Sequence, residues 1–178
     1  MSGEINEAKF KEIYDRNVDT VYKICYSYMK NKFDAEDIVQ EAFVKLIRKN
    51  PEFENEKHEK AWLIVTASNL CKNILKSWKR KIEDIENHES DCIEELKEDN
   101  TIHIVLNLPD KYKTVIYLYY YEGYTTIEIA KAMEKNESTV RSLLKRGRDL
   151  LRIEIGGKID EEFTSKRNLQ SNWIRWIQ

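Results

Sequence analysis

The most informative stretch of this chain is TTIEIAKAMEKNESTVRSLLKRGRDLLR, residues 125–152. Its first apolar residues recur at helical spacing and are expected to share one buried face: Ile127, Ile129, Ala130 and Met133. Apolar residues resume at Val140 after the polar break EKNES. Ser138 or Asn136 can cap a second helix there, because a short side-chain oxygen accepts hydrogen bonds from unpaired first-turn amides. Two helices across so short a break predict a helix-turn-helix.

The second predicted helix of this motif turns hydroxyl and cationic side chains away from its apolar face. Hydroxyls near a helix N-terminus can reach base edges or phosphates, while Lys and Arg neutralise phosphate charge and Arg can bind guanine through two hydrogen bonds. The pattern predicts a motif that reads the DNA major groove. Its expected DNA-binding residues are Thr126, Ser138, Thr139, Arg141, Ser142, Lys145, Arg146 and Arg148. A helical hairpin with a solvated basic face is the alternative.

Composition favours helices throughout the chain. The 178 residues include only five Gly and two Pro, 35% of them are charged, and strand-type alternation of apolar and polar residues is hard to find. The hydrophobic content of 41% is enough for one compact domain or two small ones. The sequence therefore predicts an all-α protein.

Charge and cysteine content narrow the function. The formal net charge is −2, whereas a free-standing DNA-binding domain usually carries a clear positive excess, so a partner is expected to assist DNA binding. The three Cys and three His lack metal-ligand spacing, so no metal or cofactor is expected, and the thiols should stay reduced in the cytoplasm. No segment approaches the roughly 20 apolar residues that span a bilayer, so no membrane insertion is expected.

The first half of the chain begins with two predicted amphipathic helices. Apolar residues recur at three- and four-residue steps over residues 8–29, and a second helix is expected from Asp34. On that second helix Asp37, Gln40 and Glu41 lie together on one face. From the pattern alone, compensation of the helix dipole and solubility explain this acidic face better than a binding role.

A polar loop over residues 50–59 is expected to lead into a third helix with two distinct faces. One face is a predicted buried stripe of Leu63, Ala67, Leu70, Ile74 and Trp78. The other side carries the expected contacts to opened nucleic acid: Trp62, Asn69, Lys72, Asn73, Lys76, Lys79 and Arg80. Bases stack on rings while Lys and Arg follow the backbone, which is why this composition suits a single strand. Dipole compensation at the helix end, with Trp62 in the core, is the alternative.

Residues 82–100 separate this region from the second half. The segment IEDIENHESDCIEELKEDN carries nine acids and one Lys in 19 residues, so it repels itself and predicts a flexible acidic linker. Fully extended it reaches roughly 60 Å, nearly two turns of B-DNA at about 34 Å each. The expected organisation is a domain over residues 8–81, the linker, a helix-turn-helix domain over 101–157, and a tail over 158–178 with no assigned role.

Three motifs in this order resemble the sigma factors of the bacterial sigma-70 family, specifically the extracytoplasmic-function group. DAEDIVQEAFVKL, residues 34–46, is similar to the region that docks on the clamp helices of the RNA polymerase largest subunit. KAWLIVTASNLCKNILKSWKRK, residues 60–81, resembles the region that recognises and opens the −10 promoter element, and the loop before it lies where the family captures a flipped base. The helix-turn-helix resembles the domain that reads the −35 element.

The resemblance implies a promoter-specificity subunit without catalytic chemistry, built from a region 2-like and a region 4-like helical domain. Its implied partners are bacterial core RNA polymerase, promoter DNA and an anti-sigma factor. The matching docking residues are Asp37, Gln40, Glu41 and Phe43, so the acidic face is now expected to bind polymerase. The third helix is expected to contact the −10 element, and the helix-turn-helix the −35 element.

The chain departs from the usual pattern in the second domain. Glu134 stands where helix-turn-helix proteins usually have a turn glycine, and Lys135 where an apolar residue is usual, so a longer or differently shaped turn is expected. Gly147 lies within the recognition helix, where it costs up to about 1 kcal/mol relative to Ala.

Two other classes compete with this interpretation. An autonomous helix-turn-helix regulator would bind palindromic half-sites without polymerase, but the near-neutral charge and the second basic surface count against it. A nucleic-acid-processing enzyme would need clustered carboxylates for metals or an activated nucleophile. The nearest acid cluster is Asp34, Glu36 and Asp37, which has no His or further acids in evident partnership.

Overall fold

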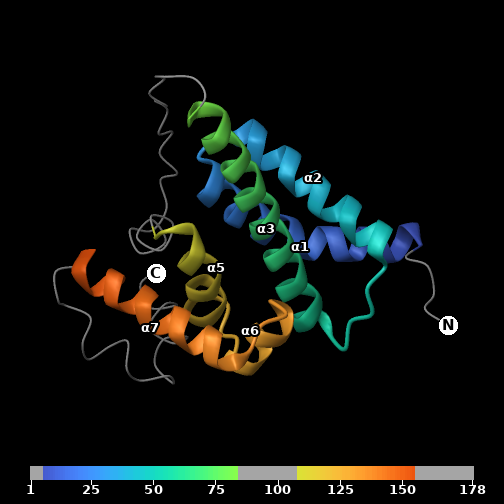
Figure 1. The fold of residues 1–178 in the computed structure, drawn as a ribbon. Helices are drawn as coiled ribbons and strands as arrows, with labels where there is room; N and C mark the ends of the chain where they lie inside the picture. Colours follow the sequence, from blue (N-terminus) through green and yellow to red (C-terminus); the bar gives the residue numbers. More distant parts are fainter. Residues whose placement is uncertain (1–5, 84–107, 155–178) are drawn as a thin grey trace, which may run out of the picture. The chain divides into compact units, whose positions relative to one another are not determined.

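The computed structural model describes residues 6–83 and 108–154, which form helices and no strand (Figure 1). Side chains are described for residues 6–80 and 108–151. The chain divides into two compact units between Lys97 and Glu98, and each unit has a buried core. The expected all-α fold is confirmed.

Asparagine caps set the starts of the first two helices. α1 (Glu7–Met29) begins where the Asn6 side chain accepts a first-turn amide hydrogen bond at 2.9 Å, in agreement with the predicted helix. α2 (Lys32–Lys49) begins where the Asn31 side chain accepts from two first-turn amides at 2.8 and 3.2 Å. The second helix therefore starts two residues before Asp34, because Asn31 satisfies its first amides.

α3 (Glu56–Glu83) is longer than expected at both ends. Its first turn is capped by the Asn55 side chain, which accepts from the amide of His58 at 2.8 Å. The expected loop to residue 59 is therefore wrong, since the helix begins at residue 56. At the other end α3 runs to residue 83, two residues into the segment expected to be linker.

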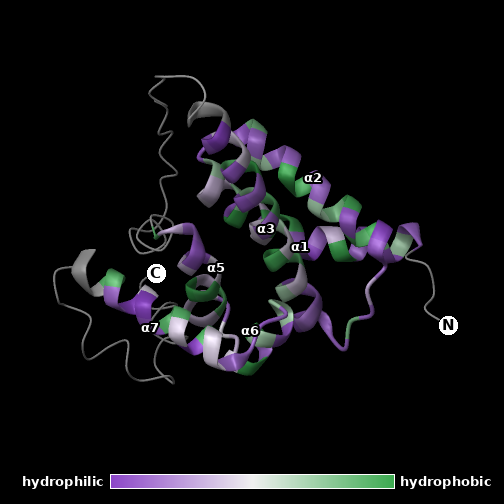
Figure 2. Ribbon diagram, viewed as in Figure 1, coloured by the Kyte–Doolittle hydropathy of each residue, from purple (hydrophilic) through white to green (hydrophobic). Residues whose placement is uncertain are grey.

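In the first unit α1 packs against both α2 and α3, which also contact each other. Apolar and polar positions alternate along each helix, as expected for helices with one buried face (Figure 2). The core includes Val21, Ile24, Cys25, Ala42, Leu46, Leu63, Ile64, Ala67 and Cys71. The predicted buried stripe on α3 is confirmed at Leu63 and Ala67, but Leu70 and Ile74 are only half-buried. It is wrong at Trp78, which is 37% exposed, towards the end of a helix of 28 residues that is longer than α1 and α2.

The second unit contains α5 (Asp110–Ile116), a π-helical turn η1 (Tyr117–Tyr121), α6 (Thr126–Ala132) and α7 (Glu137–Glu154). Gly123 lies between η1 and α6 with φ 70°, a conformation that glycine adopts without strain. α6 begins with a capping box, in which the Thr125 hydroxyl accepts from the amide of Glu128 and the Glu128 carboxylate accepts from the amide of Thr125 at 2.7 Å. The predicted helix-turn-helix is confirmed in α6 and α7.

The core of the second unit draws on all its elements: Leu108, Val115, Ile116, Tyr117, Leu118, Ile129, Val140, Leu144 and Leu151. Ile127 was expected in this core but is 67% exposed. Ile127 and Ile129 are two residues apart, about 200° around a helix, so they cannot both face the core of so short a helix. The prediction for Ile127 is wrong.

Gly147 is buried where α7 packs on α5. A Cβ atom at this position would lie 2.8 Å from Cγ1 of Ile116 and 3.3 Å from Cβ of Tyr112. The glycine therefore permits a close approach of the two helices, at the expense of helix propensity.

The expected linker beyond Glu83 and the tail over residues 158–178 lie outside the described residues. In the described ranges, no helix combines the length and hydropathy needed to cross a bilayer. The same ranges bring together no group of three or more His, Cys, Asp or Glu side chains suited to a metal ion.

Candidate nucleic-acid interface

α7 presents the predicted −35 contacts on its surface. Val140, Leu144, Gly147 and Leu151 are buried along one side of the helix, which sets the opposite side outward. The exposed residues are Ser138, Thr139, Arg141, Ser142, Lys145, Arg146 and Arg148. Thr126, at the start of α6, is half-buried. The outer side of α7 therefore offers four cationic side chains together with three hydroxyls.

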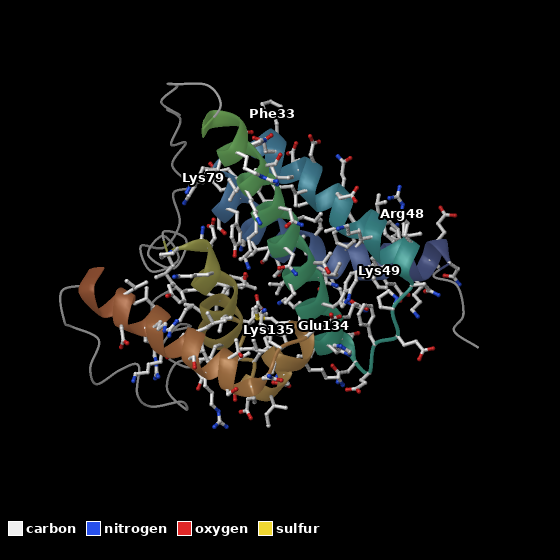
Figure 3. The ribbon with its side chains drawn as sticks, in the orientation of Figure 1. Phe33, Arg48, Lys49, Lys79, Glu134 and Lys135 are labelled. Atoms are coloured by element: carbon white, nitrogen blue, oxygen red, sulfur yellow. The ribbon has the colours of Figure 1, made fainter. Side chains whose placement is uncertain are left out.

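The turn between α6 and α7 is compact although it lacks the usual glycine. Glu134 adopts the left-handed conformation with φ 52°, and the amide of Lys135 donates to the carbonyl of Ala130 at 2.9 Å, as in the Schellman ending of a helix. Figure 3 labels Glu134 and Lys135 at this bend. The expected longer or differently shaped turn is wrong, because Glu134 takes the conformation that a glycine would adopt without strain.

Glu137, the first residue of α7, connects two of the predicted DNA contacts. Its Oε1 atom accepts from the Thr126 hydroxyl at 2.5 Å and from Nε and Nη2 of Arg141 at 3.1 and 2.7 Å. The hydrogen bonds from Thr126 and then Arg141 lower the pKa of Glu137. The carboxylate therefore joins α6 to the first turn of α7 and holds the Arg141 guanidinium beside that turn.

Most of the predicted −10 contacts on α3 are exposed. The exposed residues are Asn69, Asn73, Lys76, Lys79 and Arg80, and Figure 3 labels Lys79. Lys72 is half-buried, with its Nζ atom 5.8 Å from the ring centroid of Tyr28, a distance typical of a cation–π contact. One side of α3 therefore carries amides and cations at helical spacing.

Trp62 belongs to an aromatic cluster formed with the loop that precedes α3. The ring of Phe53 lies edge-on to Trp62, with centroids 5.9 Å apart, and edge-on to His58 at 5.6 Å. All three rings are half-buried, so the alternative that places Trp62 in the core is wrong. The cluster ties the loop to the face of α3 that carries the predicted −10 contacts.

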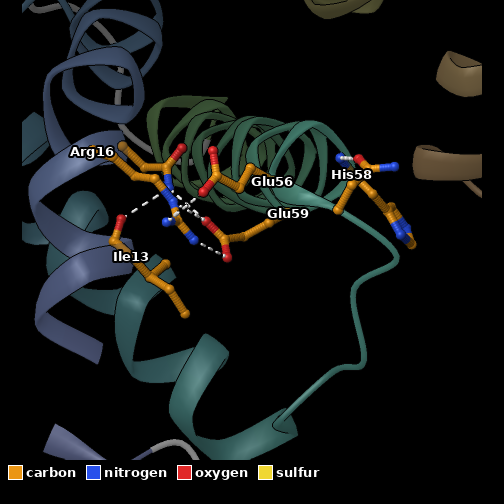
Figure 4. Close-up of polar contacts among 7 residues, drawn as sticks. Ile13, Arg16, Glu56, His58 and Glu59 are labelled. Carbon is orange, nitrogen blue, oxygen red and sulfur yellow. Dashed lines mark hydrogen bonds and ion pairs between the residues drawn. The ribbon is translucent and has the colours of Figure 1, made fainter. Parts of the chain in front are cut away.

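An ion pair between the half-buried side chain of Arg16 and the buried carboxylate of Glu59 anchors the start of α3 to α1 (Figure 4). Nη2 and Nε of Arg16 donate to the two carboxylate oxygens of Glu59 at 2.8 and 2.9 Å, and Nη1 reaches Glu56 at 3.1 Å. Asn17 Nδ2 also donates to Glu59, which is 4% exposed, at 2.8 Å. The hydrogen bond to Glu59 raises the pKa of Arg16. Because Glu59 lies three residues before Trp62, α1 fixes the base of the aromatic cluster.

The predicted polymerase-docking residues of α2 differ in exposure. Its polar residues are exposed or half-buried: Asp37, Gln40 and Glu41. Phe43, in contrast, is 2% exposed and packs against Phe10 and Tyr14 of α1, with ring centroids 6.1 and 4.8 Å away. Phe43 is therefore a core residue, so the prediction that its side chain contacts polymerase directly is wrong.

Sequence reasoning missed the residues that hold the predicted contacts in place: Arg16, Asn17, Phe53, His58, Glu59 and Glu137. The Glu137–Arg141 pair was visible in principle, because residues four apart on a helix commonly form ion pairs. Arg16 and Glu59 are 43 residues apart, so no local pattern signals their pairing.

A helical unit with a basic face, followed by a helix-turn-helix with a cationic second helix, is the architecture of a nucleic-acid-binding protein. Residues 13–81 match the family Sigma-70 region 2, and residues 98–151 match Sigma-70, region 4. The chain is 30% identical over 165 residues to the ECF RNA polymerase sigma factor SigW of Bacillus subtilis (strain 168). This alignment covers 82% of this chain and 88% of the relative. It is 32% identical over 139 residues to the RNA polymerase sigma factor SigV of the same strain, covering 75% of this chain and 83% of the relative.

The chain therefore belongs to the extracytoplasmic-function sigma factors of the sigma-70 family, as its motifs predicted, and it is a transcription initiation factor. A solved structure of the sigma factor RpoE from Bartonella quintana, in complex with the anti-sigma factor NepR, has a similar fold. The TM-score is 0.67 at 20% identity, over 84% of this chain and 98% of that chain.

Proposed function

We propose that this sigma factor binds bacterial core RNA polymerase and directs promoter-specific initiation in the cytoplasm, with no catalytic chemistry of its own. The face of α2 docks on polymerase through Asp37, Gln40 and Glu41, supported by Phe43. The α3 side contacts the opened −10 strand through Trp62, Asn69, Lys72, Asn73, Lys76, Lys79 and Arg80. The −35 element is read by Thr126, Ser138, Thr139, Arg141, Ser142, Lys145, Arg146 and Arg148.

The observation that carries this proposal is the outer side of α7. Four cations and three hydroxyls are exposed there, while the opposite side of the same helix is buried in a helix-turn-helix core. Cations in this position neutralise phosphates, and residues near the start of the helix reach base edges. The net charge of −2 supports a need for polymerase, because the isolated chain has no overall positive excess to hold it on DNA.

Run-off transcription with purified core polymerase on a promoter library tests the function as a whole. Adding the protein should produce transcripts from templates that share −10 and −35 sequences, and core polymerase alone should not. Tight binding to palindromic DNA without polymerase, and no stimulation of core, would instead support an autonomous regulator. That alternative is not favoured, because the relatives that match most of the chain are sigma factors.

Charge reversal on α2 tests the docking surface. Asp37→Arg with Glu41→Arg should abolish co-purification with core polymerase, since two repulsive charges replace two acids in the contact. Asp15→Arg with Asp19→Arg is a matched control, because these exposed acids are also four residues apart but lie on α1. Normal core binding by the α2 variant, with unchanged helicity by circular dichroism, would remove α2 from the docking surface.

An anti-sigma factor is part of the proposed function. The similar fold of RpoE was solved with NepR bound, and a protein inhibitor of that kind is expected to compete with core polymerase for this chain. A protein that co-purifies with the tagged chain from its own cells should block run-off transcription when added before core. A co-purifying protein without that effect would not fill this role.

A further inference from the structure

We infer that Glu137 is a positioning residue for −35 recognition, whose carboxylate holds Arg141 with its outer donors turned to a guanine in the major groove. Thr126 fixes that carboxylate from α6. The inference rests on the proposed function, since it requires that α7 reads the −35 element.

The hydrogen bonds to Glu137 leave the outer end of the Arg141 guanidinium available for a base. Nε and Nη2, on one edge of the guanidinium, both donate to Oε1 of Glu137. The guanidinium carries five N–H donors in a planar fork, so the end formed by Nη1 and the outer hydrogen of Nη2 still has donors for N7 and O6 of guanine. The Arg141 side chain is 68% exposed, so this end is accessible to a ligand.

The hydroxyl of Thr126 makes this pair more than a surface ion pair. An exposed pair four residues apart on one helix is weak, because both long side chains lose rotamer freedom to form it. Here the same Oε1 atom also accepts from Thr126 across the turn, which limits rotation of the carboxylate. A guanidinium ordered before binding loses less freedom when it meets a base.

Charge favours the same arrangement. A lone carboxylate at the start of a recognition helix would repel DNA phosphates, whereas Glu137 faces the Arg141 cation at 2.7 Å. Its hydrogen bonds also lower its pKa, so they favour the ionised carboxylate that accepts them. Glu137 is therefore an acid that assists a cation at a surface that binds anions.

The test is transcription by the full chain with core polymerase from promoters in which each −35 base pair is replaced in turn. Arg141→Ala should flatten the preference at one base pair and lower transcription from the best promoter about tenfold, the effect of losing a bidentate guanine contact. Glu137→Ala should flatten the preference at that same base pair by roughly threefold or more. The double variant should match Arg141→Ala alone, because Glu137 acts through Arg141.

Two further variants separate positioning from folding. Glu137→Gln keeps an acceptor oxygen and should retain most of the preference, while Glu134→Ala, an exposed acid in the nearby turn, should leave it unchanged. An equal loss on all −35 sequences with a lowered Tm would overturn the inference in favour of a structural role. Additive losses in the double variant, or a gain of transcription in Glu137→Ala, would also overturn it.

Two results distinguish the DNA contact of Arg141 from the positioning role of Glu137. If Arg141→Ala leaves every −35 preference intact while core binding is normal, the proposed reading of DNA by Arg141 fails, and the positioning role fails with it. If Arg141→Ala removes a preference that Glu137→Ala leaves untouched, only the positioning role fails.

Discussion

Gly147 leaves no room for a Cβ atom between the backbone of α7 and the side chain of Ile116. Gly147→Ala should therefore lower the free energy of unfolding of the second unit by roughly 1–2 kcal/mol, because overpacking of about 1–3 kcal/mol outweighs a helix-propensity gain of up to about 1 kcal/mol. Urea denaturation followed by circular dichroism measures the change.

The contact partner provides the control for Gly147. Ile116→Ala removes the two atoms nearest to the new Cβ and costs stability by leaving a cavity. The double variant should lose less unfolding free energy than the sum of the two single losses, because the new Cβ atom occupies space that the Ile116 side chain has left. Fully additive losses would show that the crowding is relieved by a shift of the helices instead.

The buried thiol of Cys25 is expected to make the free energy of unfolding depend on pH in the alkaline range. Hydrogen bonding with Cys71 and burial raise the pKa of Cys25, so the folded protein keeps a proton that an unfolded thiol loses above its ordinary pKa of about 8.5. The free energy of unfolding is therefore unaffected by this thiol below that pKa. Above it, the free energy of unfolding falls by up to about 1.4 kcal/mol per pH unit, because only the unfolded thiol loses its proton. Cys25→Ala should reduce the slope of unfolding free energy against pH above 8.5, and an unchanged slope would assign it to other groups.

Among the elements, α1 and α3 depend on one carboxylate for their polar contact. Glu59→Ala leaves Arg16 and Asn17 without their shared acceptor. Loss of one partner from a buried pair costs about 3–5 kcal/mol, and the 35% exposure of the Arg16 side chain reduces the expected loss to roughly 2–3 kcal/mol. Thermal unfolding monitored by circular dichroism measures it.

The same network is expected to matter for promoter opening. With core polymerase present, Glu59→Ala should reduce the fluorescence increase of 2-aminopurine placed in the −10 element, because the start of α3 is no longer fixed to α1. Glu56→Ala is the matched control, since the Glu56 side chain is 76% exposed and its pair with Arg16 is worth little. Equal effects of the two variants would contradict a special role for Glu59.

The elements that the sequence predicted well are those with a long, regular apolar period. α1 and α7 are of this kind, and the outward-facing residues of α7 are those opposite its apolar side. Errors arose where a local feature overrode the period: the Asn55 cap moved the start of α3, and the short α6 could bury Ile129 but not Ile127. Contacts such as Arg16–Glu59 were beyond prediction, because they exist only after distant segments pack together.

For the whole molecule, the acids of residues 82–100 balance two cationic surfaces on different units, which explains a net charge near zero in a DNA-binding protein. Shortening the segment over residues 84–100 to a few residues should abolish the stimulation that a −35 element gives to transcription, because the two units then fail to reach both elements. Run-off transcription from templates with and without that element measures the stimulation.

A Gly/Ser segment of the original length is the control for this deletion. It keeps the reach of a flexible chain but removes the charge, so it should retain the −35 stimulation if distance alone is required. Normal stimulation by the shortened chain would contradict the proposed engagement of two separate promoter sites.

The contact between α1 and Glu59 also determines which fragments are worth preparing for strand-binding measurements. A peptide that begins after Asn17 would contain all the proposed −10 contacts of α3, yet it would lack both donors that satisfy the Glu59 carboxylate. Such a peptide would also lose part of the packing of α1 on α3, so it should fray at the start of α3. Truncation series should therefore retain the N-terminal helix, even though none of its residues is proposed to contact DNA.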